Sequence, residues 1–329
     1  MAKHINFINR YRLKGYNSIE ELFNSIFLHL SKTESVIWTT LPNYGASINS
    51  LLKNLASIPK QRNTIYHITG DVNYIAIKFG KQSILTIHDV QSALSGSFLK
   101  KFIISWLWFK IPARKAKFIT VISKFTKSEL IEVIPRHQHK IKVIYNPVNP
   151  NIKPDNNKVF NAENPKILCV GTKGNKNLKR IISAVNGLNI ELIILGVLTP
   201  IQTDFLKINN IQYNSFNQLA FDEVIELYRN CDMVCFPSLY EGFGMPIIEA
   251  QAVGRPVLTS NYGAMKEVAG NAACLVNPLD EKEIREGILK IVGNQSYREN
   301  LVKQGFLNIS RFDIDKISQE YLNLYNQIL

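Results

Sequence analysis

The chain has 329 residues, which is long enough for two domains that each bury a core. Hydrophobic residues make up 46% and charged residues 20%, and this composition excludes an intrinsically disordered chain. Lysine and arginine number 39 against 26 aspartates and glutamates, and the resulting charge of +13 predicts an anionic partner: nucleic acid, an anionic membrane surface or phosphorylated small molecules.

The positive charge is confined to the first part of the chain. Residues 1–150 carry 21 basic and 7 acidic side chains, a net +14, whereas residues 151–329 carry 18 and 19, a net −1. One interpretation is a solvated basic surface, because net charge also maintains solubility. The other is an anionic surface or ligand that only one domain meets.

In residues 1–150, short β-rich apolar runs alternate with helical patterns, which predicts a parallel sheet. Ser18 and Glu21 have the spacing of a capping box and start the first helix. The polar loop before it, residues 10–17 with Gly15, leaves the carboxyl end of the first strand. The predicted strands are 5–8, 36–40, 65–69, 83–88, 118–122 and 141–145, and the helices lie near 18–30, 46–56 and 98–109.

Residues 146–164 are rich in Asn and Pro and predict an interdomain linker before a second α/β run. We therefore expect two Rossmann-like doubly wound domains, 1–150 and 151–311, facing across a cleft, and a C-terminal helix in 312–329 that packs back toward the first domain. Ligands of such sheets bind beyond the carboxyl ends of the strands. The predicted strands are 166–170, 191–195, 233–237, 256–259 and 273–276, and the helices are 178–185, 221–229, 246–253 and three at the C-terminal end.

A glycine turn with two lysines follows the strand that ends at Val170. It contains Gly171, Thr172, Lys173 and Lys176, and it opens a helix. Helix N-terminal amides and ammonium groups form a diphosphate site, although a plain turn with solvated lysines fits the pattern equally well. The turn matches neither a Walker loop nor a dinucleotide-binding fingerprint.

A second glycine turn follows the strand 233–237. Gly242 and Gly244 allow a ligand to approach the backbone, and Pro246, directly after Met245, suits the first turn of a helix. Glu241 and Glu249 stand eight positions apart, one before this turn and one in the helix, so both carboxylates can accept hydrogen bonds from a polyol. For Glu249 alone, stabilisation of the helix dipole is an alternative.

These residues carry a resemblance to a known family. Residues 241–249 form an E-x7-E motif, and the stretch 231–278 resembles the retaining, nucleotide-sugar-dependent glycosyltransferases of family 4, which have the GT-B fold. Similar segments follow in family order at 86–89, 121–124, 143–147, 170–172 and 176–178. They cover most of residues 83–310, whereas the first 80 residues match loosely.

The resemblance implies roles for the second glycine turn. Glu249 would bind the ribose hydroxyls of the nucleotide. Glu241, with the amides of Gly242, Phe243 and Gly244, would hold the donor sugar.

The resemblance also implies that Lys176 and the amides near Thr172 hold the diphosphate, and that His88 of the first domain hydrogen-bonds the donor sugar. Many family members carry an arginine where Thr172 stands, so Lys173 is a candidate for the second cation. In the front-face mechanism usually proposed for the family, the departing phosphate oxygen takes the acceptor proton. We expect neither a catalytic metal nor a cofactor beyond the nucleotide-sugar substrate.

The basic first domain is expected to meet an anionic acceptor, such as a glycan linked to polyprenyl diphosphate, or an anionic membrane surface. Residues 106–109 either insert into a membrane interface or pack a helix onto the sheet. The N-terminal region has no hydrophobic leader pattern, so we expect a cytoplasmic protein, peripheral on the inner face of the membrane. The candidate surface residues are Arg10, Arg12, Lys14, Gly15, Lys100, Lys101, Arg114, Lys115 and Lys117.

Other function classes fit less well. A nucleic-acid-binding protein would interleave aromatic and basic residues on a known module, and none is found. A non-catalytic sugar-binding protein of two lobes would usually be exported, and a GT-B epimerase would need a different pattern of acids or histidines. The sequences Asp313-Ile314-Asp315 and His137-Gln138-His139 are interpreted as a helix cap and a solvated turn, and the four cysteines as buried reduced thiols.

Overall fold

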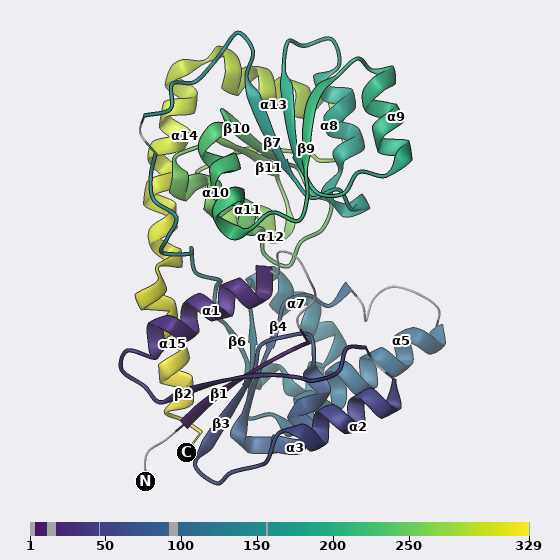
Figure 1. Cartoon of the computed structure of the whole chain (residues 1–329), viewed down its shortest axis with the longest axis vertical. Coiled ribbons are helices and arrows are strands. Elements are labelled where there is room, and N and C mark those ends of the chain that lie inside the picture. Colours follow the sequence, from purple (N-terminus) through teal and green to yellow (C-terminus); the bar gives the residue numbers. More distant parts are fainter. Residues whose placement is uncertain (1–3, 12–17, 46, 92–97, 156, 329) are drawn as a thin grey trace. The chain divides into compact units, whose positions relative to one another are not determined.

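The structure is a computed structural model that describes residues 4–11, 18–45, 47–91, 98–155 and 157–328. It divides into two compact units (Figure 1). Unit 1 consists of Met1–Pro147 together with Ile314–Leu329, and unit 2 of Val148–Asp313.

Unit 1 is built on a parallel sheet of six strands in the order β2-β1-β3-β4-β5-β6. Ile5 of β1 lies opposite Val36 of β2 on one side and Ile65 of β3 on the other. Strands β3 and β4 are buried along their whole length, as expected of central strands covered on both faces. The strands are β1 His4–Asn9, β2 Val36–Thr40, β3 Thr64–Ile68, β4 Ser83–Ile87, β5 Phe118–Val121 and β6 Ile141–Val143.

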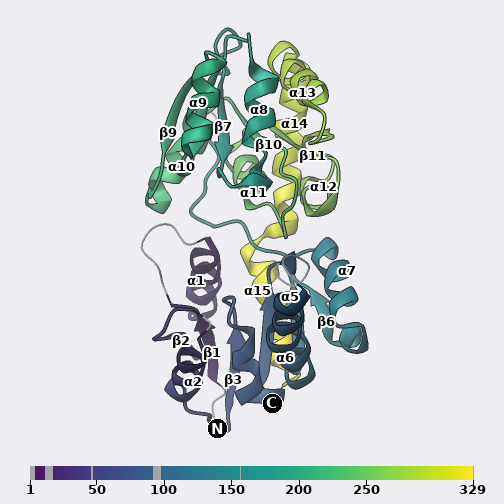
Figure 2. The same ribbon diagram turned by 90° about the vertical axis from the view of Figure 1, so that its right-hand side faces the viewer.

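The helices of unit 1 cover both faces of this sheet (Figure 2). The single helix predicted over 98–109 is α5 followed by a π-helical segment, Ser105–Lys110, which leads directly into α6. The helices are α1 Ser18–Leu30, α2 Ile48–Ser57, α3 Ala76–Phe79, α5 Phe98–Ile104, α6 Ile111–Lys115, α7 Lys124–Val133 and α15 Ile314–Tyr325, with 3-10 turns at Asn73–Ile75, Gly80–Gln82 and Pro135–Lys140.

A buried polar network attaches the C-terminal helix α15 to the sheet of unit 1. The two ring nitrogens of His67 lie 2.7 Å from the hydroxyl of Tyr325 and 2.7 Å from the hydroxyl of Thr86. Burial lowers the pKa of His67 to about 3, so the ring is neutral at pH 7. The last helix of the chain is therefore part of the fold of the first unit, where it also contacts α1.

Unit 2 repeats the architecture with a parallel sheet in the order β12-β11-β10-β7-β8-β9. Its core is formed by apolar side chains of the central strands and of the helices α8 and α13. The strands are β7 Lys166–Val170, β8 Glu191–Leu195, β9 Gln212–Phe216, β10 Met233–Phe236, β11 Val257–Ser260 and β12 Cys274–Val276.

Helix α11 of unit 2 is covered on every side. All residues from Pro246 to Val253 are buried, which fits a helix that is largely apolar around its circumference. The helices are α8 Leu178–Val185, α9 Pro200–Ile208, α10 Phe221–Asn230, α11 Met245–Val253, α12 Gly263–Ala269, α13 Glu281–Gly293 and α14 Gln295–Asn308, with 3-10 turns at Gly174–Lys176 and Ile309–Phe312.

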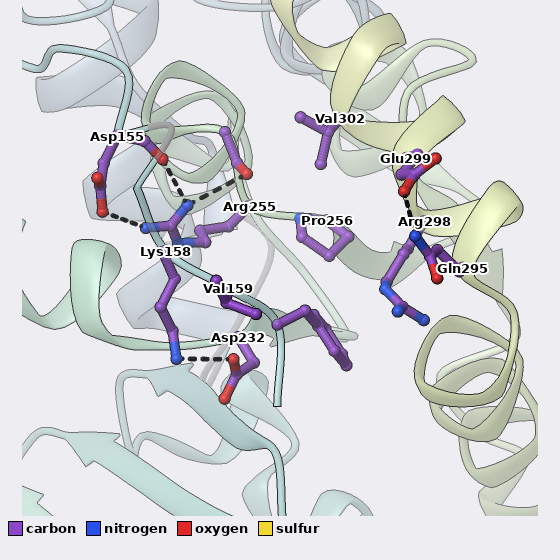
Figure 3. Close-up of a pocket in the computed structure, with 12 residues that line it drawn as sticks. Asp155, Lys158, Val159, Asp232, Arg255, Pro256, Gln295, Arg298, Glu299 and Val302 are labelled. Atoms are coloured by element: carbon purple, nitrogen blue, oxygen red, sulfur yellow. Dashed lines mark hydrogen bonds and ion pairs between the residues drawn. The ribbon is translucent and has the colours of Figure 1, made fainter. Parts of the chain in front are cut away.

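The predicted linker is attached to unit 2 by partly buried ion pairs. The guanidinium of Arg255 lies 2.6 Å from the carboxylate of Asp155, and the ammonium of Lys158 lies 2.8 Å from that of Asp232. Figure 3 shows these pairs in a cavity of about 510 Å³. Asp232 and Pro256 directly precede β10 and β11, so the cavity lies at the amino-terminal edge of the sheet. The linker residues contact the rest of unit 2 in this cavity.

The cysteines are buried free thiols. Burial raises the pKa of Cys169 and of Cys231 to about 12. A thiol in such an environment is neither a nucleophile nor a ready metal ligand at neutral pH.

Candidate active site

The two predicted glycine turns of unit 2 lie beside each other at its topological switch point. From β7 the chain continues to β8 and β9 on one side of the sheet and then crosses to β10 on the other. Because β7 and β10 are parallel neighbours, the loops that leave their carboxyl ends flank one crevice. Helix N-termini also point there, since α8 and α11 follow these loops.

The β7 loop turns tightly around its lysine. Gly171 has a φ of +92°, and a Cβ at this position would lie 2.9 Å from the side chain of Lys176. The hydroxyl of Thr172 donates to the carbonyl of Val197 at 2.6 Å, so the side chain is directed toward the loop after β8. Lys173 is exposed. Within this loop the backbone of Gly171 packs against the methylene carbons of the Lys176 side chain, whereas Lys173 is exposed.

Two asparagines join this loop to the β10 loop. The side-chain amide of Asn175 donates to the carbonyl of Tyr240 at 2.9 Å. Asn177 is buried, adopts the left-handed conformation with φ 64°, and donates to the carbonyls of Pro237 and Pro278 at 3.0 and 2.6 Å. No role was predicted from the sequence for either asparagine. The available signal was an Asn in a turn that requires positive φ, since Asn adopts this conformation more readily than most residues.

An ion pair connects the two loops at their centre. The ammonium of Lys176 lies 2.7 Å from the carboxylate of Glu241, and the two side chains are only 20% and 16% exposed. The same ammonium lies 4.8 Å from the ring centroid of Phe236, the last residue of β10. The amide of Asn175 adds a hydrogen bond of 3.3 Å to the carboxylate. The structure thus brings the predicted lysine and the first predicted glutamate into direct contact.

The second glutamate is buried next to this pair. Glu249 is 7% exposed and accepts a hydrogen bond of 2.6 Å from the hydroxyl of Tyr228 on α10. Burial raises the pKa of Glu249, and the hydrogen bond from Tyr228 and the charge of Lys176 oppose this rise. A buried carboxylate with one hydroxyl partner retains lone pairs that can accept from a ligand hydroxyl.

The turn between the two glutamates is shaped by Gly244. Its φ of +109° caps α11, where Met245 is half-buried at the first position. Gly242 is also half-buried, whereas the ring of Phe243 is buried in an edge-to-face contact with Phe312 at 5.6 Å. The side chain of Phe243 therefore belongs to the core, and only its backbone is placed to meet a ligand.

In unit 1, His88 follows β4 and is half-buried. Its Nε2 lies 2.8 Å from the carbonyl of Thr69 and must donate to it, so Nδ1 is the unprotonated acceptor of the neutral ring. Burial lowers the pKa of His88, and the bond to Thr69 and the nearby Asp71 partly offset this. Gly15, Arg12 and Lys14 lie outside the described residues, and so does the side chain of Lys100.

The carboxyl ends of β1 and β3 flank the switch point of unit 1, and sequence reasoning identified few of the groups there. Arg10 forms a bidentate pair with buried Glu20, with an Nε–Oε1 distance of 2.6 Å. A Cβ on Gly70, after β3, would lie 2.8 Å from the backbone nitrogen of Arg10. Arg10 was predicted as part of a basic surface, but the structure holds it in this pair.

Within the described ranges, no group of three His, Cys, Asp or Glu side chains has the geometry to hold a metal ion. Among the helices that the structure describes, none is both long and apolar enough to span a bilayer.

Two family models match the chain in succession. The one described as Glycosyltransferase Family 4 matches residues 31–152, and the one described as Glycosyl transferases group 1 matches residues 152–307.

Relatives that match nearly the whole chain are also described as glycosyltransferases. An uncharacterized glycosyltransferase of Methanocaldococcus jannaschii is 25% identical over 337 residues, covering 99% of this chain and 86% of the relative. The O-antigen chain mannosyltransferase RfbU of Salmonella typhimurium is 23% identical over 339 residues, covering 94% and 93%.

Solved structures share the fold along the whole chain. Sucrose-phosphate synthase of Thermosynechococcus elongatus superposes with a TM-score of 0.79 at 16% identity, covering 99% of this chain and 98% of that one. HepE of Anabaena in complex with UDP-glucose gives 0.77 at 14% identity, covering 98% and 99%.

The predicted fold class is confirmed, since the chain forms two Rossmann-like units with parallel six-stranded sheets and shares the GT-B fold of these solved structures. The chain belongs to glycosyltransferase family 4, as the resemblance of its E-x7-E segment implied.

Proposed function

We propose that this enzyme is a retaining glycosyltransferase that moves a sugar from a nucleotide-sugar donor to a glycan or lipid-linked acceptor in the synthesis of cell-surface polysaccharide. The observation that carries the proposal is the cluster of Lys176, Glu241 and Glu249 at the switch point of unit 2. The relationship to an O-antigen chain mannosyltransferase supports the polysaccharide context.

In this proposal the donor lies across the carboxyl ends of β7 and β10. Lys176 and the backbone amides near Thr172 neutralise the diphosphate as the glycosidic bond breaks, whereas the amide of Gly171 already donates to the carbonyl of Leu195 at 2.7 Å. These groups are fixed before the donor arrives, because the ammonium is held by Glu241 and the loop by its asparagines. Fixed charges and dipoles aimed at the developing negative charge are the largest source of rate acceleration in such sites.

The two glutamates bind opposite ends of the donor. Glu249 accepts hydrogen bonds from the ribose hydroxyls, and burial makes its charge costly when Tyr228 is the hydrogen-bond donor to it and the nucleotide is absent. Glu241 and the backbone of Gly242 to Gly244 bind the sugar. The departing phosphate oxygen takes the acceptor proton, so no carboxylate acts as an external base.

Unit 1 supplies the acceptor side of the reaction. His88 accepts a hydrogen bond from a donor-sugar hydroxyl through Nδ1, because its Nε2 is committed to the carbonyl of Thr69. The acceptor is a glycan, with a polyprenyl-diphosphate-linked glycan as the specific candidate. The basic charge of this unit attracts an anionic membrane surface where such acceptors reside, which makes the enzyme peripheral on the cytoplasmic face.

A donor panel tests the proposal. UDP-, GDP-, ADP- and dTDP-sugars are compared by thermal shift and by slow donor hydrolysis, and we expect one nucleotide class to stabilise the wild type. Lys176→Ala and Glu249→Ala should lose this stabilisation, whereas exposed Lys207→Ala on α9 and Glu281→Ala on α13 serve as matched controls. If no nucleotide sugar stabilises the protein, or if the site variants bind as well as the controls, the assignment is wrong.

A further inference from the structure

The helical segment of unit 1 that runs from α5 to α6 has an apolar outer ridge. Phe102, Ile103, Trp106 and Leu107 are 53%, 46%, 44% and 37% exposed, and their spacing places them on one side of the helix. The ring centroids of Phe102 and Trp106 lie 6.0 Å apart. Four large apolar side chains grouped in this way are an interaction surface rather than scattered exposure.

The same segment turns its other aromatic residues inward. Phe109 is 2% exposed, and the indole of Trp108 packs on Tyr74 and donates to the carbonyl of Asp71 at 3.2 Å. Within residues 106–109, Trp108 and Phe109 therefore pack onto the unit, whereas Trp106 and Leu107 remain exposed and available for insertion. The inward pair fixes the helix to the unit, and the ridge is left outside.

A cavity of about 750 Å³ lies beside the ridge and has both apolar and cationic walls. Trp106 borders the ridge and the cavity, and Lys110 lies 5.3 Å from its ring centroid. The remaining walls are apolar side chains of α6 and of the end of α7, and basic side chains at the rim. The apolar groups are Ile111, Val133, Ile134 and Pro135, and the basic groups are Arg114, Lys115 and Arg136; His137, whose pKa is lowered by burial and by nearby cations, and the acid Glu132 complete the lining.

The cationic rim continues into a second cavity of about 330 Å³ that shares Arg114 and Lys115. Lys140 lies at this junction and donates to the carbonyls of Ala113 and Ala116 at 2.9 and 2.8 Å, so it caps the end of α6 and holds the two rim cations in place. Lys81 and Lys117 line the same cavity, whose described lining includes no carboxylate.

These cations occupy the edge of the sheet opposite to the candidate acceptor side. Lys81, Lys117 and Lys140 stand just before β4, β5 and β6, whereas His88 stands just after β4. In a parallel sheet the starts of all strands share one edge. The positive charge at Arg114 to Lys117 thus lies away from the carboxyl ends of the strands, where an acceptor would react.

We propose that the ridge and the first cavity together bind an anionic phospholipid of a bilayer. The lipid phosphate lies on Arg114, Lys115 and Arg136, its acyl chain lies against Trp106 and Ile111, and the ridge enters the interface beside it. Charge complementarity selects the anionic lipid, because a cationic rim with a single acid repels positively charged partners and gains little from neutral ones. The inference deepens the membrane partner of the proposed function and rests on that part of it.

Vesicle co-sedimentation of the full chain tests whether binding requires an anionic headgroup. Vesicles of phosphatidylcholine alone are compared with vesicles that contain equal parts of phosphatidylglycerol, and we expect binding to the second kind only. Exposed Arg114→Glu combined with Lys115→Glu should weaken it by about tenfold or more, because each basic side chain near an anionic surface strengthens binding roughly fivefold. Lys53→Glu with Lys60→Glu makes the same charge change at exposed positions outside the cavity and should cost much less.

Brominated acyl chains test the apolar part. They should quench tryptophan fluorescence of the wild type, and Trp106→Ser should remove most of the quenching, whereas Ile48→Ser, at an exposed apolar residue of α2, should not. Donor-induced thermal shifts of all variants are measured in the same preparations, so a failure of the donor site is distinguished from a failure of the lipid site.

Three outcomes would overturn the inference. Equal losses for the two double charge reversals would mean diffuse attraction without a site. Equal binding to phosphatidylcholine vesicles, whose headgroup is zwitterionic, would remove the selection of an anionic lipid from the proposal. If single-stranded DNA displaced the protein from vesicles as effectively as soluble phosphatidylglycerol micelles do, the surface would be a general polyanion site.

Discussion

Lys176 is the side chain on which the proposed donor site depends most. In Lys176→Ala the carboxylate of Glu241 keeps the hydrogen bond of 3.3 Å from Asn175 but loses the ammonium at 2.7 Å. Breaking an exposed pair costs up to about 1 kcal/mol and breaking a fully buried pair about 3–5 kcal/mol. Because these side chains are 20% and 16% exposed, we expect a loss of about 2 kcal/mol in the free energy of unfolding of unit 2.

A double-mutant cycle separates the pair from its surroundings. Glu241→Gln removes the charge that Lys176→Ala leaves unpaired, so the double variant should be more stable than the sum of the single losses predicts, by about 1 kcal/mol or more. Urea unfolding followed by far-ultraviolet circular dichroism measures this. Tryptophan fluorescence serves as an internal control, since Trp38, Trp106 and Trp108 all belong to unit 1 and should report no change.

Activity decides whether this lysine also acts in the reaction. If it neutralises the leaving diphosphate, Lys176→Ala should lower kcat by about 10²–10³-fold, comparable to removal of one preorganised donor in other enzymes. A lysine that only supports the fold would lower stability and leave kcat of the folded fraction intact. Additive stability losses in the cycle, together with a wild-type kcat and donor affinity in Lys176→Ala, would refute the reasoning.

Two further predictions concern pH. In folded unit 1 the pKa of His67 is about 3, whereas the unfolded chain binds a proton at this residue below about pH 6.5. The free energy of unfolding of unit 1 should therefore fall by about 2 kcal/mol between pH 7 and 5. Tryptophan fluorescence should show this loss in the wild type and not in His67→Gln, and equal losses in both proteins would contradict the prediction. Burial raises the pKa of Glu249, so the cost of its charge is present above that raised pKa and disappears below the ordinary carboxyl range. Glu249→Gln should therefore raise the free energy of unfolding of unit 2 near pH 7, and this increase should disappear in acid. Calorimetry should show weaker nucleotide-sugar binding by the variant. A Gln variant less stable than the wild type at pH 7 would count against the prediction.

The sequence predicts the central parts of both units well. The strands at 166–170 and 233–237 are mainly apolar, as expected of strands covered on both faces, and the strand at 83–88 was recognisable although it buries the polar residues Ser83 and Thr86. The glycine turns after them were recognisable because positive φ at Gly171 and Gly244 restricts the residue type. Local chemistry thus marked both the elements and the loops of the candidate site.

The edges and the connections between the loops were less predictable. Strand β9 is a polar edge strand with exposed residues, and α9 and α7 were not identified before the structure. The bonds from Asn177 to Pro237 and Pro278 join segments 60 and 101 positions apart, and no local pattern encodes such a contact. Tertiary packing determines which of several polar turn residues becomes the buried one.

The structure also changes what the charge of the first domain means. A net +14 over residues 1–150 gave no indication of where on the domain an anion would bind. At the carboxyl ends of β1 and β3, Arg10 is already neutralised by Glu20, whereas the described cations that precede β4, β5 and β6 surround two cavities with one carboxylate among their lining residues. A surface charge that is not paired within the fold remains available to an external anion. The described cations around these cavities therefore lie at the edge away from the reacting groups, where, in our proposal, they hold the enzyme on a membrane without competing for the donor diphosphate.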